Sequence, residues 1–248
     1  MKIILLADNS VGLEIARWLI ANYKDDVDFV VTVRENEIAA LARKANIGTS
    51  VFTNAETVCR LVREEGMSFD LGILAWWPNL IKNPLLTLPR LGFINTHPGF
   101  LPYARGKHYN FWTIVEQVPF GVSLHMVDEG IDSGDIVAQA QIPYSWEDTG
   151  GSLRGKALVA IEQLFKDTYP KIRKLEFTRI PQNSSRGSVH RAAELEAAST
   201  IALDKSYTAR ELLNLLRART FPGYPACFFS TENGEQFEVR VEIRRRLK

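Results

Sequence analysis

The chain has 248 residues, 46% of them apolar and 24% charged, which is an ordinary composition for a soluble globular protein. Its formal net charge is +1, so no overall field favours nucleic acid or an acidic membrane as a partner. Its two cysteines, Cys59 and Cys227, form neither a CxxC pair nor a disulfide framework, and we expect buried thiols in a cytoplasmic protein.

The N-terminal part of the chain alternates between buried strands and amphipathic helices. Its apolar run at residues 3–7 is too short for an export signal or a membrane span. Strands that are apolar on both faces and alternate with helices predict an α/β fold, with a Rossmann-like, mostly parallel sheet and helices on both faces. The turn after the first strand lacks GxGxxG, which disfavours a nicotinamide or flavin cofactor. The expected strands are residues 2–7, 28–33, 49–52, 69–77 and 91–98, and the expected helices are residues 12–23, 36–46 and 54–66, the last capped by Asn54.

The rest of the chain predicts a second group of elements. A helix at residues 108–117 precedes strands at 120–129 and 135–144, and a long helix at 150–175 follows. Residues 181–191 are rich in Pro, Asn, Ser and Gly and predict a linker. Beyond it we expect a helix at 208–219 and a β-hairpin at 226–243, which turns around an Asn-Gly pair. The sequence therefore predicts a Rossmann-like domain over residues 1–180 and a small C-terminal region with a helix and a β-hairpin over residues 181–248.

The strand at 91–98 ends in an unusual polar turn, "FINTHPGFLPYARG" at residues 93–106. It brings Asn95 and His97 onto one face, and the prolines and glycines that follow prevent a regular helix or strand. In a doubly wound fold, ligands bind at the carboxyl ends of the strands. The polar residues that we expect at these ends are Asn95, His97, His125, Asp128, Glu129, Asp132 and Asp135.

Each of these residues also has an ordinary structural explanation. His97 could be a hydrogen-bonded loop histidine, His125 a structural histidine on its strand, and Asp132 a turn residue. Two imidazoles and one carboxylate could also hold zinc. Nothing in the spacing of His97, His125 and Asp132 requires a metal, however, and we expect none.

The same residues offer the parts that acyl-type transfer needs. An amide such as that of Asn95 can donate a hydrogen bond to an oxyanion, an effect of roughly 3–4 kcal/mol per donor. An imidazole can move a proton near neutral pH, and a carboxylate can orient that imidazole or a bridging water. No serine or cysteine is in an activating setting, so direct attack by the acceptor is more natural than a covalent enzyme intermediate.

Two separated motifs carry a resemblance to a known family. "FINTHPGFLPYARG" and "FGVSLHMVDEGIDSGDIVAQ" (residues 120–139) resemble the formyltransferases that use N10-formyltetrahydrofolate, whose acceptors include glycinamide ribonucleotide, methionyl-tRNA and sugar nucleotides. The resemblance covers about residues 70–142 and implies a catalytic triad of Asn95, His97 and Asp132. The sequence departs from many members at Gly99, where they carry serine.

The resemblance also implies a mechanism and a folate site. A neutral amine attacks the formyl carbon of the bound folate, while Asn95 and charged His97 stabilise the oxyanion. His97, helped by Asp132 and water, then carries the amine proton to the leaving N10. For Trp77, which lies in the expected folate segment, core packing is the alternative. The expected folate contacts are Trp77, Asn79, Leu80, Ile81, Asp128 and Gly130.

Within the family, the C-terminal run and "RGKHYNFW" (residues 105–112) resemble the sugar-nucleotide N-formyltransferases. This implies a 3- or 4-amino dideoxy sugar on a nucleotide, most naturally dTDP, as acceptor for cell-surface polysaccharide such as O-antigen, and a homodimer through the C-terminal region. The alternatives are methionyl-tRNA formylation, formyltetrahydrofolate hydrolysis and a non-catalytic folate- or nucleotide-sugar-binding module. The short C-terminal region and the near-neutral charge disfavour the tRNA alternative.

A nucleotide sugar carries a pyrophosphate, which a neutral protein must meet with local cations. Arg105 and Lys107 stand just ahead of a predicted helix, whose N-terminus also favours anions. A surface salt bridge for Arg105 and a solvated side chain for Lys107 are the alternatives. The expected acceptor contacts are Arg105, Lys107, His108, Tyr109, His125, His190 and Arg191.

Overall fold

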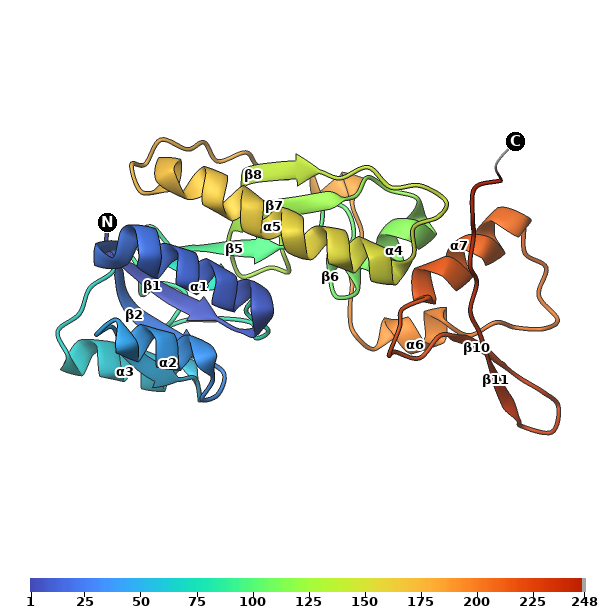
Figure 1. Cartoon of the computed structure of the whole chain (residues 1–248), viewed down its shortest axis with the longest axis horizontal. Helices are drawn as coiled ribbons and strands as arrows, with labels where there is room; N and C mark the ends of the chain where they lie inside the picture. The colour runs from blue at the N-terminus through green and yellow to red at the C-terminus, as the bar shows by residue number, and fades with distance from the viewer. Residues whose placement is uncertain (247–248) are drawn as a thin grey trace. The chain divides into compact units, whose positions relative to one another are not determined.

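The computed structural model describes residues 1–246 (Figure 1). The chain divides into two compact units, each assembled from three stretches of sequence. The first unit comprises residues 1–97, 123–139 and 161–182, and the second comprises residues 98–122, 140–160 and 183 onward. The domain boundary that we predicted between residues 180 and 181 stays a prediction.

Within the described residues, a seven-stranded sheet organises the first unit, in the order β3-β2-β1-β4-β5-β7-β8. Neighbours from β3 to β5 run parallel, and β7 is antiparallel to β5. The predicted mostly parallel sheet is therefore confirmed. The strands are β1 (Ile3–Ala7), β2 (Val27–Thr32), β3 (Gly48–Val51), β4 (Leu71–Ala75), β5 (Phe93–His97), β7 (Gly121–Met126) and β8 (Ile136–Gln141).

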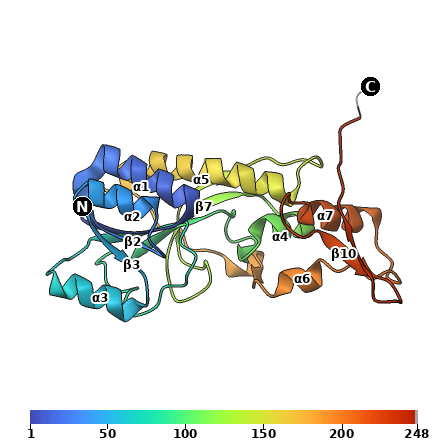
Figure 2. The ribbon, with the colours of Figure 1, turned by 60° about the horizontal axis from the view of Figure 1, so that its bottom comes forward.

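Helices cover both faces of this sheet, as predicted. Figure 2 shows α1, α2 and the end of α5 on one side and α3 on the other. The side chains of Asn36 and Asn54 accept hydrogen bonds from the first turns of α2 and α3, so the predicted cap at Asn54 is confirmed. The helices of this unit are α1 (Asn9–Tyr23), the short 3-10 helix η1 (Lys24–Asp26), α2 (Glu37–Lys44), α3 (Ala55–Glu64) and the second half of α5 (Gly150–Ile172).

The two faces of the sheet bury different side chains. On the α3 face, Leu6, Leu74 and Phe93 pack with Val58 and Val62 of the helix. On the α1 face, aromatic rings of α1 and α5 pack edge to face, with the ring centroids of Trp18 and Tyr169 6.0 Å apart. The strands are apolar on both sides because each side is covered by a helix.

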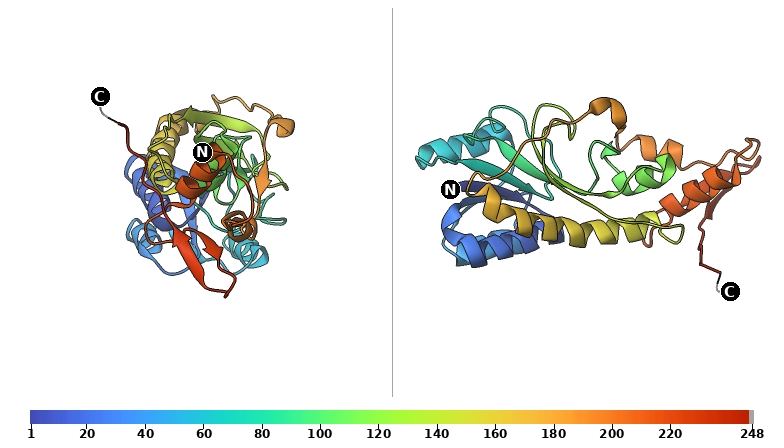
Figure 3. Two further views of the ribbon diagram at one scale, coloured as in Figure 1. Left: turned by 90° about the vertical axis from the view of Figure 1, so that its right-hand side faces the viewer. Right: turned by 90° about the horizontal axis from the view of Figure 1, so that it is seen from above.

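The second unit contains the C-terminal helix and hairpin that the sequence predicts. α4 packs on α7, and β10 pairs with β11 in an antiparallel hairpin beside α7 (Figure 3). The predicted linker differs from expectation, because part of it forms β9, which pairs in parallel with β6. The elements are β6 (Arg105–Gly106), α4 (Tyr109–Glu116), η2 (Ser184–Arg186), β9 (Val189–His190), α6 (Glu194–Ala198), α7 (Ala209–Arg219), β10 (Cys227–Ser230) and β11 (Gln236–Val239).

The state of the cysteines and the apolar character of the helices can also be compared with the sequence analysis. Cys59 and Cys227 are both free and buried, as predicted. Among residues 1–246, no helix is both long and apolar enough to cross a lipid bilayer.

A buried carboxylate ties α5 to the amino end of β2. Asp26 accepts hydrogen bonds from Tyr169 Oη at 2.9 Å and from Arg173 Nε at 2.9 Å. Burial alone would raise the pKa of Asp26, but the hydrogen bonds from Arg173 and Tyr169 outweigh it and hold the pKa below its ordinary value. A carboxyl whose pKa is lowered by folding stabilises the fold above its ordinary pKa of about 4, and that contribution is lost as the pH falls further.

We therefore expect Asp26→Asn to lower the free energy of unfolding by about 2 kcal/mol near neutral pH, since the partner Arg173 is partly exposed. Urea denaturation measures this difference. The difference in the free energy of unfolding between wild type and variant should become smaller as the pH falls below about 4. Asp25→Asn, at the exposed neighbouring position, is the control and should change little; an equal effect of both variants would contradict the assignment.

Candidate active site

The end of β5 presents two polar side chains on one face of the sheet. Asn95 and His97 are two residues apart on the strand, so both point to the side that carries α3. The antiparallel partner β7 places His125 directly opposite Asn95. His97 is 4% exposed and His125 is 2% exposed. The sheet therefore brings an amide and two imidazoles together in a buried setting.

The hydrogen bonds of His125 define its tautomer. Its Nδ1 lies 2.7 Å from the carbonyl oxygen of Met126, and a carbonyl only accepts, so Nδ1 carries a proton. In the neutral ring, Nε2 then has a free electron pair, and it lies 3.2 Å from Nδ2 of Asn95. The Asn95 amide must donate here, and its second N–H stays available for another acceptor. His125 thus orients the amide of Asn95.

Asp132 completes the cluster from the loop between β7 and β8. Its Oδ2 lies 3.4 Å from Nδ1 of His97, and its Oδ1 lies 3.5 Å from Nε2 of His125. The residue is in the left-handed region, with φ of 48°, which is uncommon outside glycine and frequent at functional sites. The three residues that we predicted as a triad, Asn95, His97 and Asp132, are therefore brought into one cluster around His125.

The loop that holds Asp132 is shaped by its own side chains. Asp128 Oδ1 accepts from the Gly130 N–H at 3.0 Å and from the Ser133 hydroxyl at 2.7 Å. A side chain at Gly130 would collide with Ser133. Gln182 donates to the Asp132 carbonyl at 2.9 Å. Asp128 and Gly130, which we predicted as folate contacts, thus build the loop, and a contact with folate stays a prediction.

The segment after β4 supplies the other predicted folate residues. Trp76 is left-handed, with φ of 55°, and its N–H donates to Thr96 Oγ1 at 2.9 Å. Trp77 packs against the core on the α3 face, but within the described residues its indole N–H is buried without a hydrogen-bond partner. Ile81 is buried in that core, while Asn79 and Leu80 are exposed. The segment therefore contains both a buried donor and an exposed apolar side chain.

Most of the predicted acceptor residues belong to the second unit. Arg105 is 8% exposed, and within residues 1–246 its Nε is buried without a hydrogen-bond partner and no carboxylate pairs with it. Arg105 therefore does not form the surface salt bridge that the sequence left open as an alternative to ligand binding. Lys107 is exposed. Burial, and then the charges of Arg219 and Lys107, lower the pKa of His108. Tyr109 is buried at the start of α4.

His190 is held more tightly than the sequence suggested. Its ring stacks on Trp112 with the centroids 3.7 Å apart. Its Nε2 lies 2.6 Å from Glu116, and its Nδ1 lies 3.0 Å from Glu194. Both ring nitrogens face carboxylates. His190 can therefore bond to the acceptor substrate only if one of these two contacts breaks. Arg191 is exposed, and its part in binding stays a prediction.

The triad cluster also has the composition of a cation site. One ligand atom from each of His97, His125 and Asp132 lies within 4.8 Å of the other two. A metal ion there would compete with Asn95 for the electron pair of His125 Nε2, because Asn95 already donates to it. The expectation that no metal binds here stays a prediction.

Sequence reasoning missed three residues near this site. Thr96 bridges β4 and β5 by accepting from Trp76 and donating to the Leu74 carbonyl. Gln182 falls in the expected linker, and no local pattern marks it as a partner of the Asp132 loop. Asp8, at the end of β1, has one buried carboxylate oxygen without a hydrogen-bond partner among the described residues. Only Asp8 had a signal, since it is a polar residue at the carboxyl end of a buried strand.

Two family models match the chain. The first is described as formyl transferase and matches residues 1–167. The second is described as the N-formyltransferase dimerization C-terminal domain and matches residues 194–245. These matches confirm the resemblance carried by the two motifs.

A curated relative gives a partial match. The methionyl-tRNA formyltransferase of Synechococcus sp. (strain JA-3-3Ab) is 32% identical over 176 residues, which are 71% of this chain. The chain spans about half, 52%, of the length of that relative.

Solved structures match nearly the whole chain and confirm the α/β fold. A sugar N-formyltransferase from Shewanella sp. FDAARGOS_354 has a TM-score of 0.80 at 20% identity, covering 100% of this chain and 99% of that one. A 4-N formyltransferase from Francisella tularensis has a TM-score of 0.77 at 26% identity, covering 98% of both chains. An N-formyltransferase from Helicobacter canadensis, solved with folinic acid and dTDP-3-aminofucose, has a TM-score of 0.70 at 20% identity, covering 94% of this chain and 84% of that one.

Proposed function

The chain belongs to the formyl transferase family, and we propose that it moves a formyl group from N10-formyltetrahydrofolate to the amino group of a nucleotide-linked 3- or 4-amino dideoxy sugar. The observation that carries this proposal is the cluster of buried His97 and His125 with half-buried Asn95 and Asp132. We place the enzyme in the cytoplasm, in the synthesis of cell-surface polysaccharide such as O-antigen, with a dTDP-linked sugar as the acceptor.

In this mechanism the acceptor nitrogen forms the new bond to the formyl carbon, and the bond from that carbon to N10 breaks. The free N–H of Asn95 donates to the formyl oxygen as that oxygen gains negative charge. His97, oriented by Asp132 at 3.4 Å, takes part in moving the proton from the acceptor amine to N10. Atoms balance without a metal or a redox partner: the products are tetrahydrofolate and the formamide.

The donor set near Trp77 fits a folate. A reduced pterin carries a carbonyl oxygen and a ring nitrogen that accept hydrogen bonds, beside its own N–H donors, so an unpaired N–H in a partly dry site can bind it. The Trp77 N–H is buried without a partner in residues 1–246, and Leu80, three residues further along the chain, is 70% exposed. Folinic acid is bound by the Helicobacter canadensis relative, which supports the same class of ligand here.

The second unit supplies the cations that a pyrophosphate needs. A buried donor without a partner is costly unless a ligand compensates it, and among the described residues the Nε of Arg105 is such a donor, on a residue that is 8% exposed. Lys107 and Arg219 add positive charge close enough to lower the pKa of His108. A nucleoside diphosphate bound by these side chains would neutralise charges that otherwise repel one another. Arg105 is therefore the main support for an acceptor that carries a pyrophosphate.

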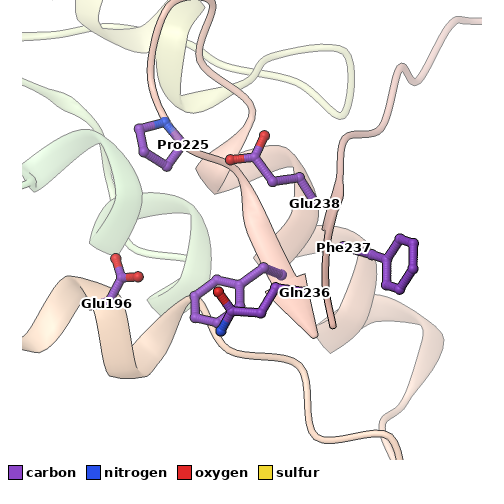
Figure 4. Close-up of a pocket in the computed structure, with 6 residues that line it drawn as sticks. Glu196, Pro225, Gln236, Phe237 and Glu238 are labelled. Atoms are coloured by element: carbon purple, nitrogen blue, oxygen red, sulfur yellow. The ribbon is translucent and has the colours of Figure 1, made fainter. Parts of the chain in front are cut away.

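We also propose that two copies of the chain associate through the C-terminal hairpin. The hairpin lies in the region that matches a dimerization domain. Figure 4 shows its small surface pocket, with the ring of Phe237 turned away from the other residues that line it. Phe237 is 47% exposed and Tyr224 is 51% exposed. An exposed edge strand with aromatic side chains is a natural pairing surface for a second copy.

Methionyl-tRNA formylation is the second candidate, because the curated relative has that activity. The two candidates share the triad chemistry and differ only in the acceptor. Charged initiator tRNA and aminosugar nucleotides should therefore be offered to the same enzyme preparation.

The reaction itself is tested first. Purified enzyme with N10-formyltetrahydrofolate should add the mass of one formyl group to a dTDP-linked 3- or 4-amino dideoxy sugar, measured by mass spectrometry. Asn95→Ala, His97→Asn and Asp132→Asn should each reduce kcat by at least about 100-fold, the scale of transition-state donors and proton-transfer groups. Folinic acid should still raise the melting temperature of each variant.

In the same assay His125→Gln should lose less activity than His97→Gln, because a glutamine oxygen can still accept from Asn95. Equal losses would give His125 a primary role. Formylation of initiator tRNA by the wild type, without formylation of any aminosugar nucleotide, would overturn the acceptor assignment.

Arg105→Met should raise KM for the sugar nucleotide by about tenfold or more, because it removes a charge-assisted contact while keeping an unbranched apolar stem. KM for the folate should stay within about twofold. Lys107→Ala should act in the same direction but less, since Lys107 is exposed. Arg210→Met, at an exposed arginine of the same unit, is the control. An unchanged acceptor KM in Arg105→Met would move the pyrophosphate elsewhere.

Phe237→Asp should convert the dimer into a monomer, because a charge would be buried in an apolar contact. Light scattering after size-exclusion chromatography should give twice the 28.0 kDa chain mass for the wild type and a single chain mass for the variant. Val159→Asp alters another exposed apolar residue, which is 72% exposed, and should remain dimeric. A dimeric Phe237→Asp would place the interface outside the hairpin.

A further inference from the structure

Asp8 is a buried carboxylate that nothing in the fold explains. The residue is 6% exposed, and its Oδ2 accepts from the Asn9 side chain at 2.8 Å. Its Oδ1 is buried and has no hydrogen-bond partner in the part of the chain that the structure describes. Asp8 precedes α1, yet its side chain does not cap that helix. A carboxylate of this kind usually has a donor for each oxygen, so the missing donor points to a ligand.

The sheet register places Asp8 beside the triad. Leu6 pairs with Leu74, and Leu74 pairs with Asn95, so the three residues form one row across β1, β4 and β5. Asp8 lies two residues beyond Leu6, as His97 lies two residues beyond Asn95. Asp8 keeps an extended backbone, with φ of −149°, so its side chain stays on the face of Leu6. Asp8 and His97 therefore share one face and one edge of the sheet.

This position is also where an α/β sheet binds ligands. β1 is followed in the sequence by β2 and β3 on one side, and β4 and β5 lie on its other side. The strand order thus reverses between β1 and β4, and ligands of open α/β sheets bind at the carboxyl ends beside such a point. Asp8 continues the ladder there, since its N–H donates to the Ala75 carbonyl at 3.2 Å.

We propose that Asp8 is a specificity-determining residue of the acceptor site, whose Oδ1 accepts a hydrogen bond from a hydroxyl group of the acceptor sugar. Two strand spacings separate Asp8 from His97, on the order of 10 Å between their Cα atoms. That separation suits a donor a few bonds away from the reacting nitrogen rather than the nitrogen itself. A carboxylate repels phosphate, so the partner is a neutral hydroxyl and not the pyrophosphate.

One of the segments proposed for folate follows β4, the strand next to β1, and the other follows β7. Because Asp8 adjoins the first of these segments, separate KM values for sugar and folate decide between the two ligands. The inference rests on the proposed function, because it requires a sugar acceptor. Asn9 supports the arrangement: it is left-handed, with φ of 57°, and its amide holds Oδ2 so that Oδ1 stays free.

The experiment uses the whole chain with dTDP-3-aminofucose, its 4-amino counterpart and deoxy analogues that lack one hydroxyl each. Asp8→Asn should raise KM for the preferred sugar by about tenfold or more, with KM for N10-formyltetrahydrofolate within about twofold. In the wild type, one deoxy analogue should show the same loss. With Asp8→Asn, KM for that deoxy analogue should be no higher than KM for the parent sugar. The substitution and the missing hydroxyl remove the same hydrogen bond, so their effects should not add. Asp25→Asn is the exposed carboxylate control.

Asn9→Ala is the second variant, in case Asp8→Asn does not fold. It leaves the carboxylate but removes the donor to Oδ2, so it should weaken sugar binding in the same direction and to a smaller extent. If the wild type formylates a sugar and both variants keep its KM, the role of Asp8 alone is overturned. A rise confined to the folate KM also overturns it. If the wild type formylates none of the sugars, the proposed function falls and the role of Asp8 falls with it.

Discussion

The pairing of β5 with β7 is the constraint on which the candidate site depends. Asn95 faces His125 only in the observed register, and a slip of one residue would turn Asn95 and His97 to the opposite face. The face that β5 presents is fixed on its other side, where the ring of Phe93 fills the space above Gly72 of β4. Apolar packing at one end of β5 therefore sets the position of the polar groups at the other end.

The alternation of strands and helices was predictable because burial on both faces leaves a clear apolar pattern, as in residues 3–7 and 71–75. The cluster of Asn95, His97 and Asp132 was predictable because two motifs carry those residues. The pairing of β6 with β9 was not, since each strand has two residues, too few for any periodicity. The contacts of Gln182 with the Asp132 loop were also beyond sequence reasoning, because they join residues about fifty positions apart.

The two units use charge in opposite ways. In the first unit, Asp26 is buried but accepts hydrogen bonds from Tyr169 and Arg173, so its charge stabilises the fold. In the second unit, Arg105 is buried, and no carboxylate of the described residues forms an ion pair with it. A fold keeps such a group at a cost in stability only when another requirement outweighs that cost. Asp26 is therefore a structural charge, whereas the part that we propose for Arg105 is to bind a ligand.

Three residues close to the strand ends of the first unit have a strained backbone. Asn9 follows β1, Trp76 follows β4 and Asp132 lies in the loop after β7, and all three have left-handed φ angles. Glycine would adopt this conformation without strain, so the side chains at these positions are retained for another reason. Asn9 holds Asp8, and Asp132 faces both histidines. Left-handed residues also occur elsewhere, at Asn46, Ala104, His108, Gln117 and Leu175. The strain at Asn9 and Asp132 is therefore informative only together with the polar contacts that these two residues make.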